Sequence, residues 1–362
     1  MAAYTTIDDP SAYFKVQLYT GNGSANHAIT FNDTDTNMQP DLVWIKNRDS
    51  TDEHCLFDAV RGATKVINLP VTDAEDTDAD TLDSFASDGF QVDADVKVNT
   101  NTEKYVAWCW SAGTGSGSSN TAGSLNTTTT SVNTTSKFSM CTYTAAGSAS
   151  GSTIGHGFSA VPHIIIVKCT TVAEEWVMYH HKNTAAPETD YLSLDKTAAT
   201  QDDNVWEDTA PTSTLITVGD NNRTNSIAAN YGDYEYVMYA WSEVQGFSKF
   251  GGYTGNGNAD GAFIYTGFRP AWILIKRTDN TNSWYLHDNK REGYNGSAHN
   301  YANDVLEPHN ANAEAEGYLD ILSNGFKIRS TGVSINGANP HVYMAFAEAP
   351  FVNSKGVPCN AR

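Results

Sequence analysis

The segment 270–276 reads Pro-Ala-Trp-Ile-Leu-Ile-Lys, a proline followed by five apolar residues and a lysine. A continuous apolar run of this length is typical of a strand that is buried on both faces. Proline is tolerated at the first position of such a strand, where no ladder donor is needed. The same proline-to-lysine spacing recurs at 40–46 and 162–168. We therefore expect three buried strands, each ended at the solvent by its lysine.

Other landmarks recur in the same order around this strand. The first is an aromatic-led strand that runs into a glycine-rich turn, at 18–23, 141–147 and 252–257. The second is an aromatic closing strand, at 105–110, 236–241 and 343–347. Residues 87–90 and 323–326 share a further signal, Ser-Asp-Gly-Phe or Ser-Asn-Gly-Phe, which predicts a tight turn into a strand. From the first copy to the second the turn tyrosine moves 124 positions and the proline 122, and from the second to the third they move 110 and 108. Matching offsets of ordered landmarks indicate an internal repeat.

The predicted fold is all-β, with three tandem antiparallel β-sandwich domains of a jelly-roll or lectin-like type. A repeat longer than 100 residues can bury its own core, so we expect each copy to fold alone. The segment between the first two copies is rich in Gly, Ser, Thr and Asn, which predicts either a flexible linker or an exposed β-excursion. The expected boundaries are an N-terminal arm at 1–13, repeat 1 at 14–110, the linker at 111–137, repeat 2 at 138–243, repeat 3 at 247–351 and a C-terminal tail at 352–362.

Charge and cysteine usage narrow the class of protein. The net charge is −20, from 22 Lys and Arg against 42 Asp and Glu, so the basic footprint of a nucleic-acid-binding protein is missing. The five cysteines form no CxxC pair, which favours small buried side chains over a disulfide framework. No apolar run is long enough to span a membrane, and the N-terminus has no signal-peptide pattern. We therefore expect synthesis in a cytoplasm and no membrane insertion.

The acidic run 73–83 is the candidate cation site, with Asp76, Asp78 and Asp80 as its candidate ligands. Alternate carboxylates can converge on a hard cation such as Ca²⁺. The glycine for the sharp turn and the closing glutamate of a calcium loop are missing, so a solvated loop without cofactor is the preferred interpretation.

Aromatic side chains are the candidate ligand-binding residues. Rings on loops over a rigid sandwich suit carbohydrate binding, because they stack on the apolar faces of sugars. The candidates are Trp176, Trp206, Tyr231 and Trp284. The alternative for each is that it fills a core, which is the commoner fate of a large ring.

Catalytic signatures are missing from the sequence. There is no nucleophile elbow, phosphate loop or HExxH motif. Paired carboxylates for glycoside hydrolysis remain an alternative, with Glu174 and Glu175 or Glu314 and Glu316 as candidates. Each pair occurs in one repeat only, so we expect a protein that is not an enzyme.

The landmarks together resemble a known family. The segments 19–23, 40–46, 57–62 (Phe-Asp-Ala-Val-Arg-Gly) and 87–90, with the closing segment 342–351, resemble a repeated domain in virion structural proteins of tailed bacteriophages, particularly marine ones. The resemblance spans nearly the whole chain, and repeat 2 is the most diverged. Its motifs are framework motifs and carry no catalytic residue, and we interpret Asp58 and Arg61 as a structural ion pair.

The resemblance implies a virion component made in the host cytoplasm, either a tail fibre or appendage or a capsid decoration. Its partners would be other virion proteins and copies of itself. Two alternatives remain open at this stage. One is a glycan-binding adhesin or receptor-binding protein with a host surface glycan as its partner, and the other is a polysaccharide-degrading enzyme.

Overall fold

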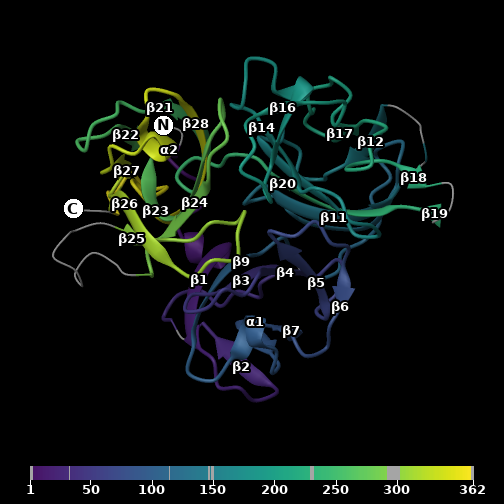
Figure 1. Cartoon of the computed structure of the whole chain (residues 1–362), viewed down its shortest axis with the longest axis horizontal. Coiled ribbons are helices and arrows are strands. Elements are labelled where there is room, and N and C mark those ends of the chain that lie inside the picture. The colour runs from purple at the N-terminus through teal and green to yellow at the C-terminus, as the bar shows by residue number, and fades with distance from the viewer. Residues whose placement is uncertain are drawn as a thin grey trace.

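A computed structural model describes residues 3–31, 33–113, 115–145, 147, 151–228, 232–291 and 302–359. The protein is nearly all-β and consists of antiparallel sheets. In Figure 1 the strands of the three repeats form three lobes around a common centre. The helical segments are single turns, namely η1 (Pro10–Ala12), α1 (Val96–Asn99), η2 (Pro187–Thr189) and α2 (Val333–Asn336).

Repeat 1 forms a six-stranded sheet in the order β1-β9-β3-β4-β5-β6 and a three-stranded sheet in the order β2-β8-β7. The tight turn expected at Asp88-Gly89 joins β7 to β8, and Gly89 has a φ of 130°. The strands are β1 (Phe14–Thr20), β2 (His27–Thr30), β3 (Leu42–Asn47), β4 (His54–Asp58), β5 (Lys65–Leu69), β6 (Asp76–Thr77), β7 (Leu82–Ala86), β8 (Gly89–Val92) and β9 (Lys104–Trp110).

Repeat 2 contributes most of a seven-stranded sheet in the order β10-β11-β20-β13-β14-β15-β16, together with two two-stranded sheets, β12-β17 and β18-β19. The strands are β10 (Thr127–Asn133), β11 (Phe138–Thr144), β12 (Ser152–Gly155), β13 (Ile164–Cys169), β14 (Val177–His180), β15 (Asp190–Ser193), β16 (Gln201–Asp202), β17 (Leu215–Val218), β18 (Ile227–Ala228), β19 (Gly232–Asp233) and β20 (Glu235–Trp241). Strand β10 lies within the segment 111–137, so the β-excursion is the alternative observed there.

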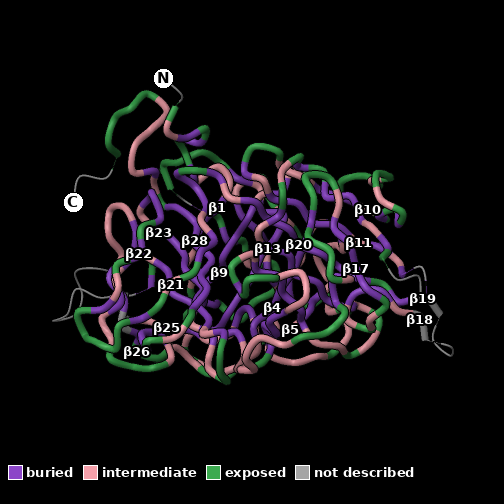
Figure 2. Tube along the Cα trace, turned by 90° about the horizontal axis from the view of Figure 1, so that it is seen from above, coloured by how far each residue is buried: buried purple, intermediate pink, exposed green. Residues whose placement is uncertain are grey.

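Repeat 3 forms two four-stranded sheets, in the orders β21-β28-β23-β24 and β22-β27-β26-β25. The strands are β21 (Ser248–Thr254), β22 (Phe263–Tyr265), β23 (Phe268–Arg277), β24 (Trp284–Asp288), β25 (Ala302–Val305), β26 (Ala315–Leu322), β27 (Gly325–Ile328) and β28 (Pro340–Pro350). The N-terminal arm lies on this repeat, where the Tyr4 hydroxyl donates to the Gly267 carbonyl and Ile7 is buried. The described segments near the two termini meet at one corner of the molecule, where the Ser354 N–H donates to Asp8 at 2.6 Å (Figure 2).

The three proline-led strands, β3, β13 and β23, occupy equivalent positions. Each pairs with the closing strand of its own repeat and, on its other side, with the strand that follows it. All three apolar runs are buried, as predicted. The prediction for the lysines is wrong, because Lys46, Lys168 and Lys276 are each 0% exposed.

Each large sheet buries both faces, and this explains how the repeats are joined. One face packs on the smaller sheet of the same repeat, so that Val43 and Ile45 belong to a cluster confined to repeat 1. The alternate residues, Leu42 and Trp44, belong to a second cluster shared by all three repeats. Repeats 2 and 3 have clusters of their own as well. The molecule is therefore β-sandwich-like within each repeat and has one further core between the repeats.

The shared core is aromatic at its centre. The Trp110 ring of repeat 1 makes edge contacts with Trp241 of repeat 2, at 6.3 Å between centroids, and with Trp272 of repeat 3, at 5.6 Å. Aromatic pairs in this geometry stabilise a core beyond the area that they bury. Figure 2 shows the buried interior running through the whole molecule rather than being confined to separate lobes.

Candidate functional site

The expectation of exposed ligand-binding rings is wrong for three of the four candidates. Trp176 is 0% exposed, and Trp206 and Trp284 are each 1% exposed. Trp176 directly precedes β14 and Trp284 is the first residue of β24, which are equivalent positions in repeats 2 and 3. Both rings belong to the shared core. Trp206 lies in the core of repeat 2. The candidate Tyr231 lies outside the described residues.

The acidic run makes local contacts of its own. The Asp76 carboxylate accepts the Thr77 N–H at 2.7 Å, and the Asp78 carboxylate accepts the Asp80 N–H at 2.9 Å. Within the described ranges no group of three or more His, Cys, Asp and Glu side chains could hold a metal ion. The geometry of Asp76, Asp78 and Asp80 therefore gives no support to a calcium site.

A buried ion pair joins repeats 1 and 2. The Arg61 Nε donates to Asp58 Oδ2 at 2.6 Å, as the sequence suggested. The Tyr239 hydroxyl of repeat 2 donates to the same carboxylate oxygen at 2.6 Å. Glu75 accepts from the Arg61 Nη1 at 3.1 Å. Because buried charges need partners, this network fixes the two repeats relative to each other.

The same arrangement recurs between repeats 3 and 1. Asp288, which pairs with Trp272 as Asp58 pairs with Leu42, accepts from Arg291 at 2.6 Å and from the Trp108 indole at 3.0 Å. Burial alone would raise the pKa of Asp288, but the Arg291 guanidinium holds that pKa below its usual value. Trp108 lies in β9 at the position that Tyr239 occupies in β20.

Between repeats 2 and 3 the equivalent residue is His180. It pairs with Ile164 in the register that Asp58 and Asp288 have in their repeats, and its Nε2 lies 3.1 Å from the carbonyl of Tyr343 in β28. Burial lowers the pKa of His180 to about 3, so the ring is neutral and donates to that carbonyl. Each repeat thus contacts the next in turn, and the three contacts close a ring with approximate threefold symmetry.

Two of the three buried lysines reinforce these junctions. The Lys168 Nζ donates to the Thr72 carbonyl of repeat 1 at 3.0 Å, and the Lys276 Nζ donates to the Thr197 carbonyl of repeat 2 at 3.4 Å. Lys46 donates to carbonyls of its own repeat. Burial lowers the pKa of each of the three to about 8. Sequence alone missed this role because the carbonyls come from distant loops.

One carboxylate of each pair considered for hydrolysis is engaged in ion pairs, namely Glu175 and Glu314. Glu314 receives hydrogen bonds from Arg48 and an ion pair from Arg291. Although burial acts to raise it, the pKa of Glu314 is lowered by these partners, and the pKa of Glu175 is lowered likewise by Lys196 and Arg223. A general acid needs a raised pKa at neutral pH, so this geometry gives neither residue that role.

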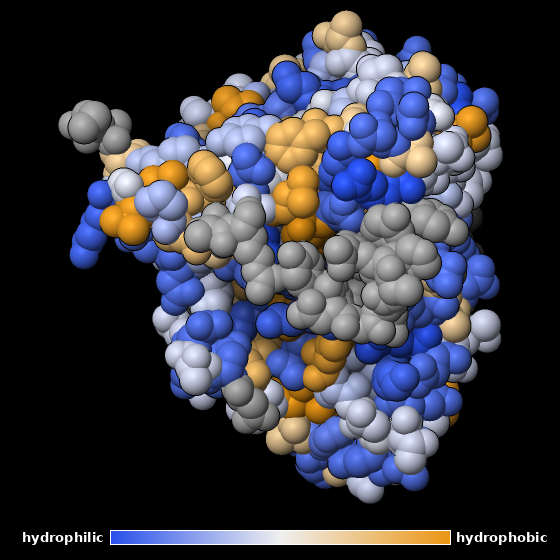
Figure 3. Space-filling model, turned by 90° about the vertical axis from the view of Figure 1, so that its left-hand side faces the viewer, coloured by the Kyte–Doolittle hydropathy of each residue, from blue (hydrophilic) through white to orange (hydrophobic). Residues whose placement is uncertain are grey.

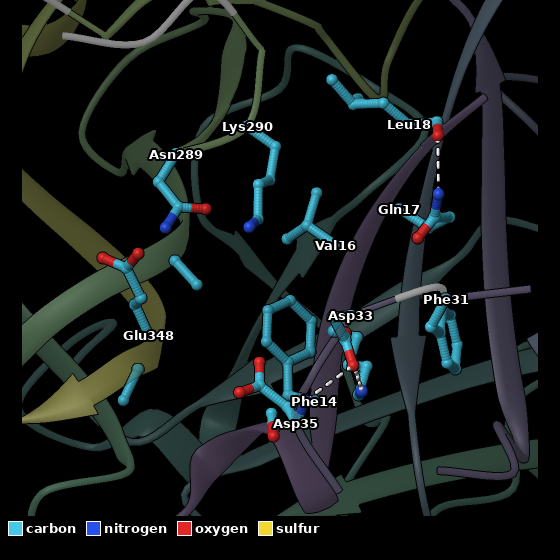
Figure 4. A pocket seen from close by; sticks show the side chains of 14 residues that line it. Phe14, Val16, Gln17, Leu18, Phe31, Asp33, Asp35, Asn289, Lys290 and Glu348 are labelled. Atoms are coloured by element: carbon cyan, nitrogen blue, oxygen red, sulfur yellow. Dashed lines mark hydrogen bonds and ion pairs between the residues drawn. The ribbon is translucent and has the colours of Figure 1, made fainter. Parts of the chain in front are cut away.

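A surface groove of about 290 Å³ runs between β1 of repeat 1 and the end of β24 in repeat 3. Figure 4 shows Asn289, Lys290 and Glu348 on one side of it and Gln17 and Phe31 on the other. Its apolar lining residues are Phe14, Val16, Leu18, Ala271 and Ala347.

Two charged groups at the edge of the groove are paired with each other. The Lys15 Nζ donates to both carboxylate oxygens of Asp33 at 2.8 Å and lies 5.1 Å from the centre of the Phe31 ring. Figure 3, which shows the side of the molecule at the left of Figure 1, has hydrophobic residues gathered in the middle of a mostly hydrophilic face. The groove is therefore a candidate surface for binding a ligand.

The fold and these contacts define an all-β, β-sandwich-like protein in which three repeats share one core. The chain belongs to the DUF7483 family, a domain of unknown function, whose model matches residues 9–350. Comparison with the curated proteins gives no match, and neither does comparison with the solved structures. One family model thus spans all three repeats and the ring of contacts between them. No helix of the described ranges is long and apolar enough to cross a membrane.

Proposed function

We propose that the protein is a non-enzymatic structural component of a bacteriophage particle. In this proposal three tandem jelly-roll or lectin-like β-sandwich domains form one rigid block on the particle surface, as a tail fibre, appendage or capsid decoration. Its partners are other virion proteins and copies of the chain. The resemblance of the repeat motifs to those of phage virion proteins supports the class.

One structural observation carries the proposal. The groups that could have served chemistry connect the repeats instead: the Asp58 carboxylate is bound by Tyr239, the Asp288 carboxylate by Trp108, and Trp176 lies in the shared core. Aromatic and charged side chains that form contacts between the repeats are what a rigid structural protein needs. The acidic net charge of −20 suits contacts with proteins rather than with nucleic acid.

Three of the four candidate residues of the carbohydrate-binding alternative, Trp176, Trp206 and Trp284, are buried. In each carboxylate pair of the hydrolase alternative one member, Glu175 or Glu314, forms ion pairs. We therefore carry neither forward as a second proposal.

The experiment is to locate the chain on purified particles. Cys359 is exposed, whereas the other four cysteines are buried, so a maleimide-gold label should react with this chain at Cys359. Particles that carry Cys359→Ser are the matched control for labelling of other proteins. Gold at every lattice point of the capsid would indicate decoration, and gold at the tail would indicate an appendage. A chain that stays in the soluble fraction and is missing from the particles by mass spectrometry would overturn the proposal.

A further inference from the structure

Three strands of the molecule are equivalent edges of the large sheets. Strands β1, β11 and β21 each pair with the closing strand of their repeat, in registers that match Phe14 with Trp110, Phe138 with Trp241 and Ser248 with Phe346. Val16, Met140 and Phe250 are therefore equivalent positions. An open strand edge presents unpaired N–H and C=O groups, which proteins normally cover.

The edge of β11 is covered by another strand. β10 runs antiparallel to it, with Ser131 opposite Met140 and Asn133 opposite Phe138. The added strand also touches repeat 1, where the Thr129 hydroxyl lies 3.4 Å from the Val60 carbonyl.

The edge of β21 is covered by side chains. The Phe250 N–H donates to Glu243 Oε1 at 2.8 Å, and His181 Nε2 donates to the Phe250 carbonyl at 2.6 Å. Both backbone groups at this position are thus satisfied without a strand.

At Val16 the edge of β1 has neither cover among the residues that the structure describes. Ser111 donates to the Tyr13 carbonyl and Gly21 donates to the Glu103 carbonyl, so the odd-numbered residues of β1 face β9. Val16 accordingly directs its N–H and C=O away from β9, and it has no hydrogen bond to any residue in the described ranges. The Leu18 carbonyl, further along β1, accepts a hydrogen bond from Gln17 Nε2 at 2.7 Å.

The groove of Figure 4 lies along this open edge. Asn289 takes the place of His181 there, because their N–H groups donate to the equivalent carbonyls of Ala271 and His163. The Asn289 Oδ1 atom is buried and has no hydrogen-bond partner among the described residues. At the junction of repeats 1 and 2 the corresponding groove is smaller, about 220 Å³, and it begins at Thr142, near the end of the β10 pairing.

We propose that the β1 edge binds an extended segment of a separate polypeptide, which adds antiparallel to β1 as β10 adds to β11. No described segment of the chain fills this edge, because the arm that precedes β1 turns at Pro10–Ala12 and binds repeat 3 through Tyr4. The equivalent segment before β11 folds back as β10. Strand addition to an open edge is an established way of recognising peptides.

The chemistry of the segment follows from the groove and from β10. The charges that line the groove balance, because Lys15 pairs with Asp33 and Glu348 pairs with Arg269. The remaining two, Lys290 and Asp35, have opposite signs, so a neutral strand is favoured. The occupant that covers the equivalent edge consists of Thr, Ser, Val and Asn. We therefore assign to the groove a neutral strand of small polar and β-branched residues. This proposal goes beyond the proposed function and holds wherever in the cell or particle the chain is located.

The test uses the full chain and a fluorescent peptide with the sequence of residues 126–134, Asn-Thr-Thr-Thr-Thr-Ser-Val-Asn-Thr. Saturable binding by anisotropy is expected. Val16→Pro should weaken it about tenfold, because it removes an edge donor without touching the β9 ladder. Val16→Thr keeps the donor and the β-branched shape, so it is the matched control and should bind like the parent chain.

Asn289→His is a second variant that does not depend on proline in a strand. Its ring should cap the Val16 carbonyl, as His181 caps Phe250, and weaken peptide binding by a similar factor. Peptide binding should also slow hydrogen exchange at the Val16 amide. No binding at millimolar peptide, or equal binding by Val16→Pro and the parent chain, would overturn the proposal. A dimer of the chain that dissociates in Val16→Pro would overturn it too, since the edge would then be covered by a second copy.

Discussion

Removal of one hydroxyl at the junction of repeats 1 and 2 tests whether the ring of contacts stabilises the protein. Tyr239 donates to Asp58 Oδ2 at 2.6 Å, and both side chains are at most 1% exposed. A hydrogen bond to a charged group contributes about 1.5–3 kcal/mol. Asp58 keeps its bonds to Arg61, so we expect Tyr239→Phe to lower the free energy of unfolding by about 2 kcal/mol, or about 30-fold in the folding equilibrium.

The assay is urea unfolding followed by circular dichroism, with Tyr179→Phe as the control. Tyr179 is also buried in repeat 2, but its hydroxyl has no hydrogen-bond partner in the described part of the chain. We expect that change to stay within about 0.5 kcal/mol. If Tyr239→Phe cost no more than Tyr179→Phe, the reasoning that this bond secures the junction would be refuted.

Three further outcomes are expected. Trp110→Ala should lower the free energy of unfolding by about 3–5 kcal/mol and leave a single unfolding transition, because Trp110 contacts both other repeats. Separate transitions for the repeats would contradict this. The free energy of unfolding should fall as the pH drops from 6.5 to 4.5, because His180 binds a proton in the unfolded chain but, with a pKa of about 3, not in the folded one. This residue alone should lower it by about 2 kcal/mol across that window, and unfolding curves that do not change with pH there would count against the assignment. Calcium or a chelator should leave the melting temperature unchanged, because the Asp76 and Asp78 carboxylates accept hydrogen bonds from backbone N–H groups. A rise of the melting temperature with calcium would instead support a cation site in the acidic run.

Much of the fold could be predicted from local pattern. The apolar run of Trp272 to Ile275 and the turn at Asp88-Gly89 each specify one element through interactions within a few residues. The candidate site could not be predicted in this way. Whether Trp284 is exposed depends on the Ser193 and Lys196 carbonyls that its indole reaches in another repeat, about 90 residues away.

By itself the sequence determined the all-β class, the threefold internal repeat, the buried central strands and the Asp58–Arg61 pair. All of these follow from short-range alternation, turn chemistry and recurrence along the chain. Only the tertiary structure decided that the second face of each large sheet turns inward to a common core. It buries the lysines against carbonyls of neighbouring loops and, within the described ranges, leaves one of three equivalent edges without a covering strand or side chain at its centre. The reason is that hydrophobic burial is non-directional: the alternation in β3 shows that both faces must leave water, but not which partner each face meets.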